Sequence, residues 1–319
     1  MARIPRPLPA PLSSRVFTRA EARELGVPPS RLRRKDLRRL GSGLYVAAGC
    51  RVTELEMASA VTWGRPELVV SGASAARIWD FPLPAELEAG SDEDAAARRL
   101  EVTVPRSGLR PTTSGLRVRT ASLPSAAVRF LGDVPITTRT QTWVDLAGRL
   151  TDLQLTAIGD HFVRRPRPGL EGGRTGPWAS LQELRMVVER NAGRPGIVQM
   201  RRVLDRVRVG ADSPMETELR LALEDAGLPE AQLNLPLLGP RGESLHEPDL
   251  QWPTWRVACE YEGAGHRTAA QMRRDIDRAE RLRRIGWIEV RVMIDHMHRG
   301  AEIAIDRVSR ALRDHGWPG

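Results

Sequence analysis

Four acidic residues in the last third of the chain have the types and spacing that suit a divalent cation. Asp249 follows a proline, ten residues separate it from Glu260, and Glu262 lies two positions further on; Glu216 comes earlier. Carboxylate oxygens are the ligands that Mg²⁺ and Mn²⁺ prefer. Such an ion lowers the pKa of bound water and stabilises charge on a phosphodiester. The four acids therefore predict a metal-dependent hydrolytic site.

The segment around these acids reads as a β-hairpin. Two extended stretches flank Pro253-Thr254, which we expect to form a two-residue turn. That turn pairs Asp249 with Ala258 and places Glu260 diagonally opposite Asp249, on the same face and about 7–8 Å away. Glu262 shares this face because side chains along a strand alternate with period two. We expect three residues to ligate the metal: Asp249, Glu260 and Glu262.

Each acid also has a plainer interpretation. Ser213-Pro-Met-Glu216 is typical of a helix start, so Glu216 is a capping-box residue, a catalytic residue, or both. Asp249 could cap a turn, although its place within the hairpin favours metal binding. Burying Glu260 in an apolar strand is costly without a partner. His266, just past that strand, is either a general acid or base or an ordinary loop histidine.

The order of these elements resembles the PD-(D/E)xK nucleases, and in particular the Vsr-like endonuclease family. Pro248-Asp249 and Glu260-Tyr-Glu262 carry the resemblance, and it continues through Gly263-Ala-Gly-His266, Asp275-Ile-Asp-Arg278, Leu282 and Arg284-Ile-Gly-Trp-Ile-Glu-Val-Arg291. It implies a restriction-endonuclease-like fold with Glu216, Asp249, Glu260, Glu262 and His266 as catalytic residues. The chain departs from the general motif at Glu262, where a lysine is usual. An acid there cannot neutralise the phosphate, but it could hold a second metal. Vsr-like members often carry an acidic residue at this position.

Most of the excess positive charge lies at the N-terminus. The chain has a net charge of +9, and residues 1–50 carry eleven basic against three acidic residues. Thr18-Arg-Ala-Glu21 predicts a capped helix, residues 31–40 a second, basic helix, and residues 44–48 a strand that could serve as a wing. These elements describe a winged helix-turn-helix whose outward residues would contact DNA phosphates: Arg31, Arg33, Arg34, Lys35, Arg38 and Arg39. The alternatives are a merely solvated helix face, or a basic segment that binds acidic protein surfaces.

A second resemblance covers about the first 150 residues. Val16-Phe-Thr-Arg-Ala-Glu-Ala-Arg-Glu-Leu-Gly-Val27 and Leu40-Gly-Ser-Gly-Leu-Tyr-Val46 resemble the N-terminal domain of AbiEi-family antitoxins, and residues 70–77 and 135–146 continue the similarity. It implies a winged helix and, through the type IV toxin–antitoxin systems of that family, a cognate toxin as partner. The function of residues 51–165 is not readable. We interpret their polar residues as caps and turns: Ser71, Ser74, Thr138, Arg139 and Asp145.

The sequence thus predicts an α+β, multidomain protein. We expect a flexible tail (1–12), a winged helix-turn-helix (13–50), a middle α/β region (51–165), a linker with helices (166–212) and a nuclease domain with a mixed sheet flanked by helices (213–319). No apolar run approaches the roughly 20 residues of a membrane span, and Cys50 and Cys259 read as reduced thiols of a cytoplasmic protein. Two functions compete: an Mg²⁺- or Mn²⁺-dependent DNA endonuclease, and a non-cutting regulator or antitoxin with a degenerate nuclease fold.

Overall fold

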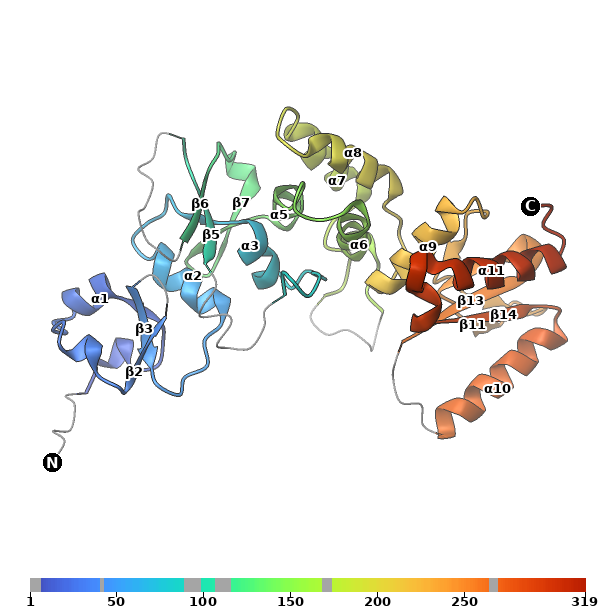
Figure 1. Cartoon of the computed structure of the whole chain (residues 1–319), viewed down its shortest axis with the longest axis horizontal. Helices are drawn as coiled ribbons and strands as arrows, with labels where there is room; N and C mark the ends of the chain where they lie inside the picture. Colours follow the sequence, from blue (N-terminus) through green and yellow to red (C-terminus); the bar gives the residue numbers. More distant parts are fainter. Residues whose placement is uncertain (1–6, 41–42, 89–98, 107–115, 168–173, 264–268) are drawn as a thin grey trace. The chain divides into compact units, whose positions relative to one another are not determined.

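The chain folds into two compact α+β units in the computed structural model. Unit 1 comprises Met1–Arg149 and Gly193–Gly196, and unit 2 comprises Leu150–Ala192 and Ile197–Gly319 (Figure 1). The structure describes residues 7–40, 43–88, 99–106, 116–167, 174–263 and 269–319. Over these ranges, none of the helices has the length and apolar character that a membrane span requires.

Unit 1 begins with a small three-stranded sheet and one helix. Strands β1 (Phe17–Thr18), β2 (Leu37–Leu40) and β3 (Leu44–Ala47) are antiparallel in the order β1-β3-β2, and α1 (Arg19–Glu24) follows β1. The predicted capping box is confirmed. The Glu21 amide donates to the Thr18 hydroxyl at 3.0 Å, and the Thr18 amide donates to the Glu21 carboxylate at 2.6 Å. These local bonds fix the start of α1.

The predicted basic helix over residues 31–40 is wrong. Residues Arg31–Arg33 form only one 3-10 turn, and Leu37–Leu40 form strand β2. Leu37 pairs with Ala47 and Leu40 with Leu44. Both leucines are buried, on opposite faces of the hairpin and in different hydrophobic clusters. Helix propensity contributes little free energy per residue, even for good helix formers such as arginine and leucine. Burial of these two leucines by strand pairing outweighs it.

The rest of unit 1 is a five-stranded sheet with helices. Its strands lie in the order β6-β5-β4-β8-β7. They are β4 (Val69–Val70), β5 (Leu100–Val104), β6 (Leu116–Thr120), β7 (Val128–Leu131) and β8 (Val134–Thr137), with helices α2 (Glu54–Thr62), α3 (Gly72–Ile78) and α5 (Arg139–Asp145). One hydrophobic core joins this sheet to the N-terminal hairpin, since Leu40 and Val46 belong to the same cluster as Val70, Val102 and Ile136.

Unit 2 contains a mixed four-stranded sheet flanked by helices, as expected. The strand order is β14-β13-β12-β9, with β13 and β14 parallel and the other pairs antiparallel. The strands of unit 2 are β9 (Gln232–Leu233), β10 (Leu237–Leu238), β11 (Ser244–His246), β12 (Leu250–Trp252), β13 (Val257–Glu262) and β14 (Ile288–Met293). Its helices are α6 (Asp152–Val163), α7 (Leu181–Arg190), α8 (Ile197–Arg206), α9 (Pro214–Asp225), α10 (Ala269–Arg284) and α11 (His298–Asp314).

The two faces of this sheet are covered differently. Leu219 of α9 and Leu312 of α11 pack with Val257 and Val292 in one core, while Leu282 of α10 packs with Ala258 on the other face (Figure 1). We expected α10 to bury Met272, Ile276, Ala279, Leu282 and Ile285. Leu282 is buried and Ile285 partly so, but Ile276 is 55% exposed. The Met272 side chain lies outside the described residues.

Candidate active site

The hairpin that carries the acids has a longer connection than predicted. Residues Pro253–Trp255 form a 3-10 turn, and Arg256 adopts a left-handed conformation with φ of 52°. The predicted two-residue turn is therefore wrong. The predicted register placed Ala258 opposite Asp249, whereas in the structure Leu250 pairs with Cys259. Continuing this register by one residue places Asp249 directly opposite Glu260. Opposite residues of an antiparallel pair share one face and lie closer than diagonal ones.

Both acids of this pair are held by protein donors. The Tyr261 amide donates to Oδ2 of Asp249 at 2.7 Å. Glu260 shares a hydrogen bond with the ring Nε2 of His246, the last residue of β11. Sequence reasoning missed His246, although a histidine three residues before Asp249, at the end of a short strand, was a usable signal. The contact orients the Glu260 carboxylate on the face that it shares with Asp249.

Glu216 lies in the first turn of α9, next to the sheet. The Ser213 hydroxyl accepts from the Glu216 amide at 3.2 Å, so Ser213 is the predicted N-cap. The reciprocal bond of a capping box is absent from these contacts: the Glu216 carboxylate instead accepts from the Asp212 amide at 2.8 Å. It also accepts from the Ser213 hydroxyl at 2.9 Å and the Asn234 amide at 2.9 Å. Glu216 thus serves both as a helix-start residue and as a member of the acidic group.

The three acids interact through their charges. Burial, and then the negative charges of Glu260 and Glu216, raise the pKa of Asp249 to about 8. Burial also raises the pKa of Glu216, and the charge of Asp212 adds to the effect. Crowded carboxylates disfavour one another's ionisation, and a divalent cation reverses this effect by supplying positive charge. The site therefore has the electrostatic character of a cation-binding position.

Glu262 has a different environment. It lies on the same face of β13, where Nη1 of Arg291 is 3.4 Å from its Oε1. Arg291, on β14, is the parallel partner of Glu260 and also donates to Glu289 at 2.7 Å. Arg278 of α10 donates to the same carboxylate at 3.0 Å. Burial raises the pKa of Glu289, but the contacts with both arginines outweigh it and lower that pKa overall. An arginine from the neighbouring strand thus brings positive charge to the face where the usual lysine is replaced.

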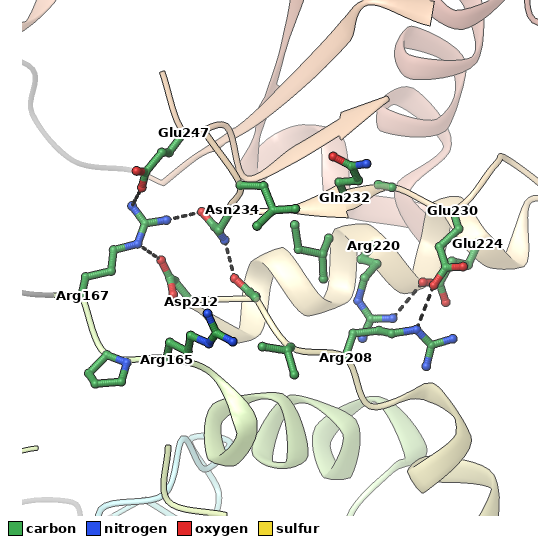
Figure 2. Close-up of a pocket in the computed structure, with 16 residues that line it drawn as sticks. Arg165, Arg167, Arg208, Asp212, Arg220, Glu224, Glu230, Gln232, Asn234 and Glu247 are labelled. Carbon is green, nitrogen blue, oxygen red and sulfur yellow. Dashed lines mark hydrogen bonds and ion pairs between the residues drawn. The ribbon is translucent and has the colours of Figure 1, made fainter. Parts of the chain in front are cut away.

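A hollow of about 500 Å³ in unit 2 is lined in part by Asp212 and Asn234. Arg167 lies at its rim and contacts Asp212 and Asn234, and the Asn234 amide in turn bonds Glu216. Figure 2 shows the contacts of Arg167 with Asp212 and Asn234, with Arg165 on the same side of the hollow as Arg167. The positive charge of Arg167 opposes the upward shift of the Asp249 pKa. The hollow therefore joins basic side chains to the acidic group through Asn234.

The fit of a metal rests on two of the predicted ligands. Across the part of the chain that the structure describes, no three His, Cys, Asp or Glu side chains are grouped so that they could hold a metal ion. Asp249 and Glu260 nevertheless offer facing carboxylates, and Mg²⁺ is commonly held by one or two carboxylates together with water and a substrate phosphate. Glu262 is engaged by Arg291. His266 lies outside the described residues.

The raised pKa of Asp249 predicts a pH dependence of stability. Between its ordinary value of 3.8 and about 8, Asp249 holds a proton in the folded chain that the unfolded chain releases. The free energy of unfolding should therefore fall as the pH rises through this window. Urea unfolding in EDTA, at pH 5 and pH 8, should show a smaller decrease for Asp249→Asn than for the wild type. Equal decreases in the two proteins would contradict the assigned environment.

Comparison with known proteins identifies relatives of the chain but no family. No family model matches it. The chain is 35% identical over 153 residues to the uncharacterized proteins MT2308 and Rv2248 of Mycobacterium tuberculosis, a match that covers 47% of this chain and 56% of each relative. The chain thus spans about half the length of the curated relatives it matches. A crystal structure of the RV2827C protein from the same organism aligns with a TM-score of 0.38 and 15% identity, over 71% of this chain and 84% of that one. A likeness this weak carries no argument about function.

Proposed function

We propose that this protein binds DNA and that residues 213–319 form a Vsr-like PD-(D/E)xK endonuclease domain. The reaction is divalent-metal-dependent hydrolysis of DNA phosphodiester bonds. The observation that carries the proposal is the pair Asp249, directly before β12, and Glu260 of β13, which the strand register places opposite one another, with Glu216 near enough to raise the Asp249 pKa. Partly buried acids are rarely grouped in this way unless a ligand or counter-charge compensates them.

The roles follow from the contacts of each residue. Asp249 and Glu260 would hold Mg²⁺ or Mn²⁺, with Glu216 adding negative charge. When bound, the ion supplies Lewis acidity toward the phosphate and a lower pKa for an attacking water. His246 fixes the orientation of Glu260 through its ring nitrogen. Arg291 provides the positive charge for the phosphate that a lysine supplies in the general motif, and the hollow beside Arg165 and Arg167 receives a neighbouring backbone phosphate.

The basic N-terminal residues provide the sequence-independent part of DNA binding. Arg33, Arg34 and Lys35 are exposed in the segment before β2, and Arg39 is exposed on β2. The other two residues predicted to contact DNA form hydrogen bonds within the protein. Arg31 donates to Asp36 at 2.7 and 2.9 Å, and Arg38 donates to the Cys50 carbonyl at 3.1 Å. We propose that α1 and the β2–β3 hairpin belong to a winged helix whose basic residues lie on a turn and a wing.

This assignment predicts a salt dependence. Duplex affinity should fall with salt by a logarithmic slope of about 0.9 per neutralised phosphate. The substitutions Arg33→Ala, Arg34→Ala and Arg39→Ala together should flatten that slope by up to about three. Fluorescence anisotropy with a labelled duplex at several salt concentrations measures it. A control with the same charge change, Arg65→Ala, Arg106→Ala and Arg129→Ala, uses exposed arginines elsewhere in unit 1. Equal slopes for the two triple variants would refute the assignment.

A second candidate function has one observation in its favour. Each acid already has a protein donor: Tyr261 for Asp249, His246 for Glu260, Asn234 for Glu216 and Arg291 for Glu262. Such contacts suit a retired nuclease fold in a non-cutting regulator or antitoxin, with a cognate toxin protein as partner.

One experiment separates the two functions. Supercoiled plasmid and linear duplex DNA are incubated with the full chain in Mg²⁺ or Mn²⁺, with and without EDTA. Nicking or linearisation that EDTA abolishes is expected for the endonuclease. If neither metal supports cleavage of either DNA form while the duplex is still bound, the regulator is the better conclusion.

A further inference from the structure

Two sequence stretches with no readable function meet at a second hollow, in unit 1. Residues 70–77 include the end of β4 and most of α3, and residues 135–146 include α5. Helices α3 and α5 pack together. The hollow has a volume of about 470 Å³ and lies between these elements and strands β5 and β6. It is lined by charged residues: Glu101, Arg117, Arg119, Asp145 and Arg149. The folded chain therefore concentrates charge where the sequence suggested only caps and turns.

Two acids are anchored in this hollow by short contacts. Arg149 donates to Glu101 at 2.6 Å, and the Ala73 amide donates to the same oxygen at 3.1 Å. Gly72 permits this approach, since a Cβ there would lie 2.2 Å from the Glu101 carboxylate. Asp145, expected to be a turn residue, has a side chain only 1% exposed and accepts from Arg194 at 2.8 Å. Each acid thus has one arginine at hydrogen-bonding distance.

Two further arginines, Arg117 and Arg119, add positive charge near these acids. Arg117 is 4.0 Å from Glu101 and Arg119 is 3.6 Å from Asp145, beyond the range of a direct hydrogen bond. Their side chains are 66% and 44% exposed. They are two residues apart on the edge strand β6, so they point to the same side. Four arginines against two acids leave a local charge of +2, which suits a phosphate group.

We propose that Arg117 and Arg119 bind a phosphate group in this hollow, beside the acids Glu101 and Asp145 that Arg149 and Arg194 already pair. A guanidinium presents five donors in a planar fork that matches phosphate oxygens. The phosphate is either a backbone phosphodiester of DNA or the phosphate of a free nucleotide. The site does not depend on the endonuclease domain, because every residue named belongs to unit 1.

The test compares two double variants of the full chain. Arg117→Ala/Arg119→Ala removes the proposed donors, and Arg65→Ala/Arg129→Ala removes the same charge elsewhere in unit 1, with Arg129 on the opposite edge strand β7. The probes are a mononucleotide, by calorimetry, and a short duplex DNA, by anisotropy across salt concentrations. Circular dichroism checks folding. If the alanine variant unfolds, Arg117→Gln/Arg119→Gln replaces it, since glutamine keeps more of the side-chain length.

The outcomes are distinct. We expect the β6 variant to bind one of the probes at least about tenfold more weakly than wild type, with the control unchanged. Loss of mononucleotide binding alone identifies a free nucleotide as ligand. Loss of duplex affinity, with a salt slope flatter by about two, identifies a backbone phosphate. The proposal is overturned if the β6 variant and the control bind both probes alike.

Discussion

Asp249→Asn is expected to eliminate divalent-ion-dependent DNA cleavage while leaving duplex binding unchanged. The substitution keeps the shape and the acceptor for the Tyr261 amide, but removes the negative charge that faces Glu260. A hard cation depends on carboxylate charge. Removing an outer-shell partner of a metal can already lower activity by about 10- to 100-fold, so loss of a proposed ligand should exceed about 100-fold. Initial nicking rates of plasmid DNA measure the change, and anisotropy measures binding.

Glu260→Gln should behave in the same way, because it removes the facing charge. Asp306→Asn, which neutralises an exposed acid paired with Arg310 on α11, is the matched control and should cleave like the wild type. EDTA sensitivity in every active sample excludes a contaminating metal-independent nuclease. Chelator-sensitive cleavage that persists in both Asp249→Asn and Glu260→Gln would be incompatible with the assigned ligands.

Arg220→Met is expected to destabilise unit 2 by about 3–5 kcal/mol. The Arg220 side chain is 2% exposed and the Asp160 side chain 1%, and their charged groups are 2.8 Å apart. Asp160 also accepts from the Thr217 hydroxyl at 2.8 Å and the Arg208 amide at 2.7 Å. Methionine fills much of the volume but leaves the Asp160 charge buried without its counter-ion. For a unit of this size the loss corresponds to a decrease in Tm of roughly 10 °C.

A second substitution tests whether the uncompensated charge causes the loss. Asp160→Asn in the Arg220→Met background removes the charge while keeping an acceptor for Thr217 and Arg208, so it should recover much of the stability. Arg310→Met, which breaks an exposed pair with Asp306, should cost less than about 1 kcal/mol. Urea unfolding of all variants gives the comparison. A double variant no more stable than Arg220→Met would show that packing, rather than charge, dominates at this position.

The buried pair also matters for the candidate site. Thr217 and Arg220 lie on α9, within about one turn after Glu216, while Asp160 lies on α6. Their contacts fix the first turns of α9 against α6, and so hold the Glu216 carboxylate beside the sheet. Loss of Arg220 should therefore reduce any metal-dependent activity at temperatures where the chain is still folded.

Local sequence determined the features that depend on near neighbours. Thr18 and Glu21 form a capping box because both partners lie within one helical turn, and Ser213 caps α9 for the same reason. The common face of Asp249, Glu260 and Glu262 was also predictable, even though the predicted hairpin register was wrong. The observed pairing differs from the predicted pairing by two residues, and a shift of two preserves the face on which every side chain lies.

Tertiary structure alone decided the features that join distant segments. Residues 37–40 became a strand because β3 offered a partner that buries Leu37 and Leu40. The approach of His246 to Glu260, of Arg291 to Glu262 and of Arg220 to Asp160 depends on the paths of the intervening loops and on the choice of strand neighbours. Arg220 and Asp160 are 60 residues apart. Local propensity and side-chain periodicity carry no information on contacts between residues so far apart in sequence. Such contacts form only when the whole core is packed.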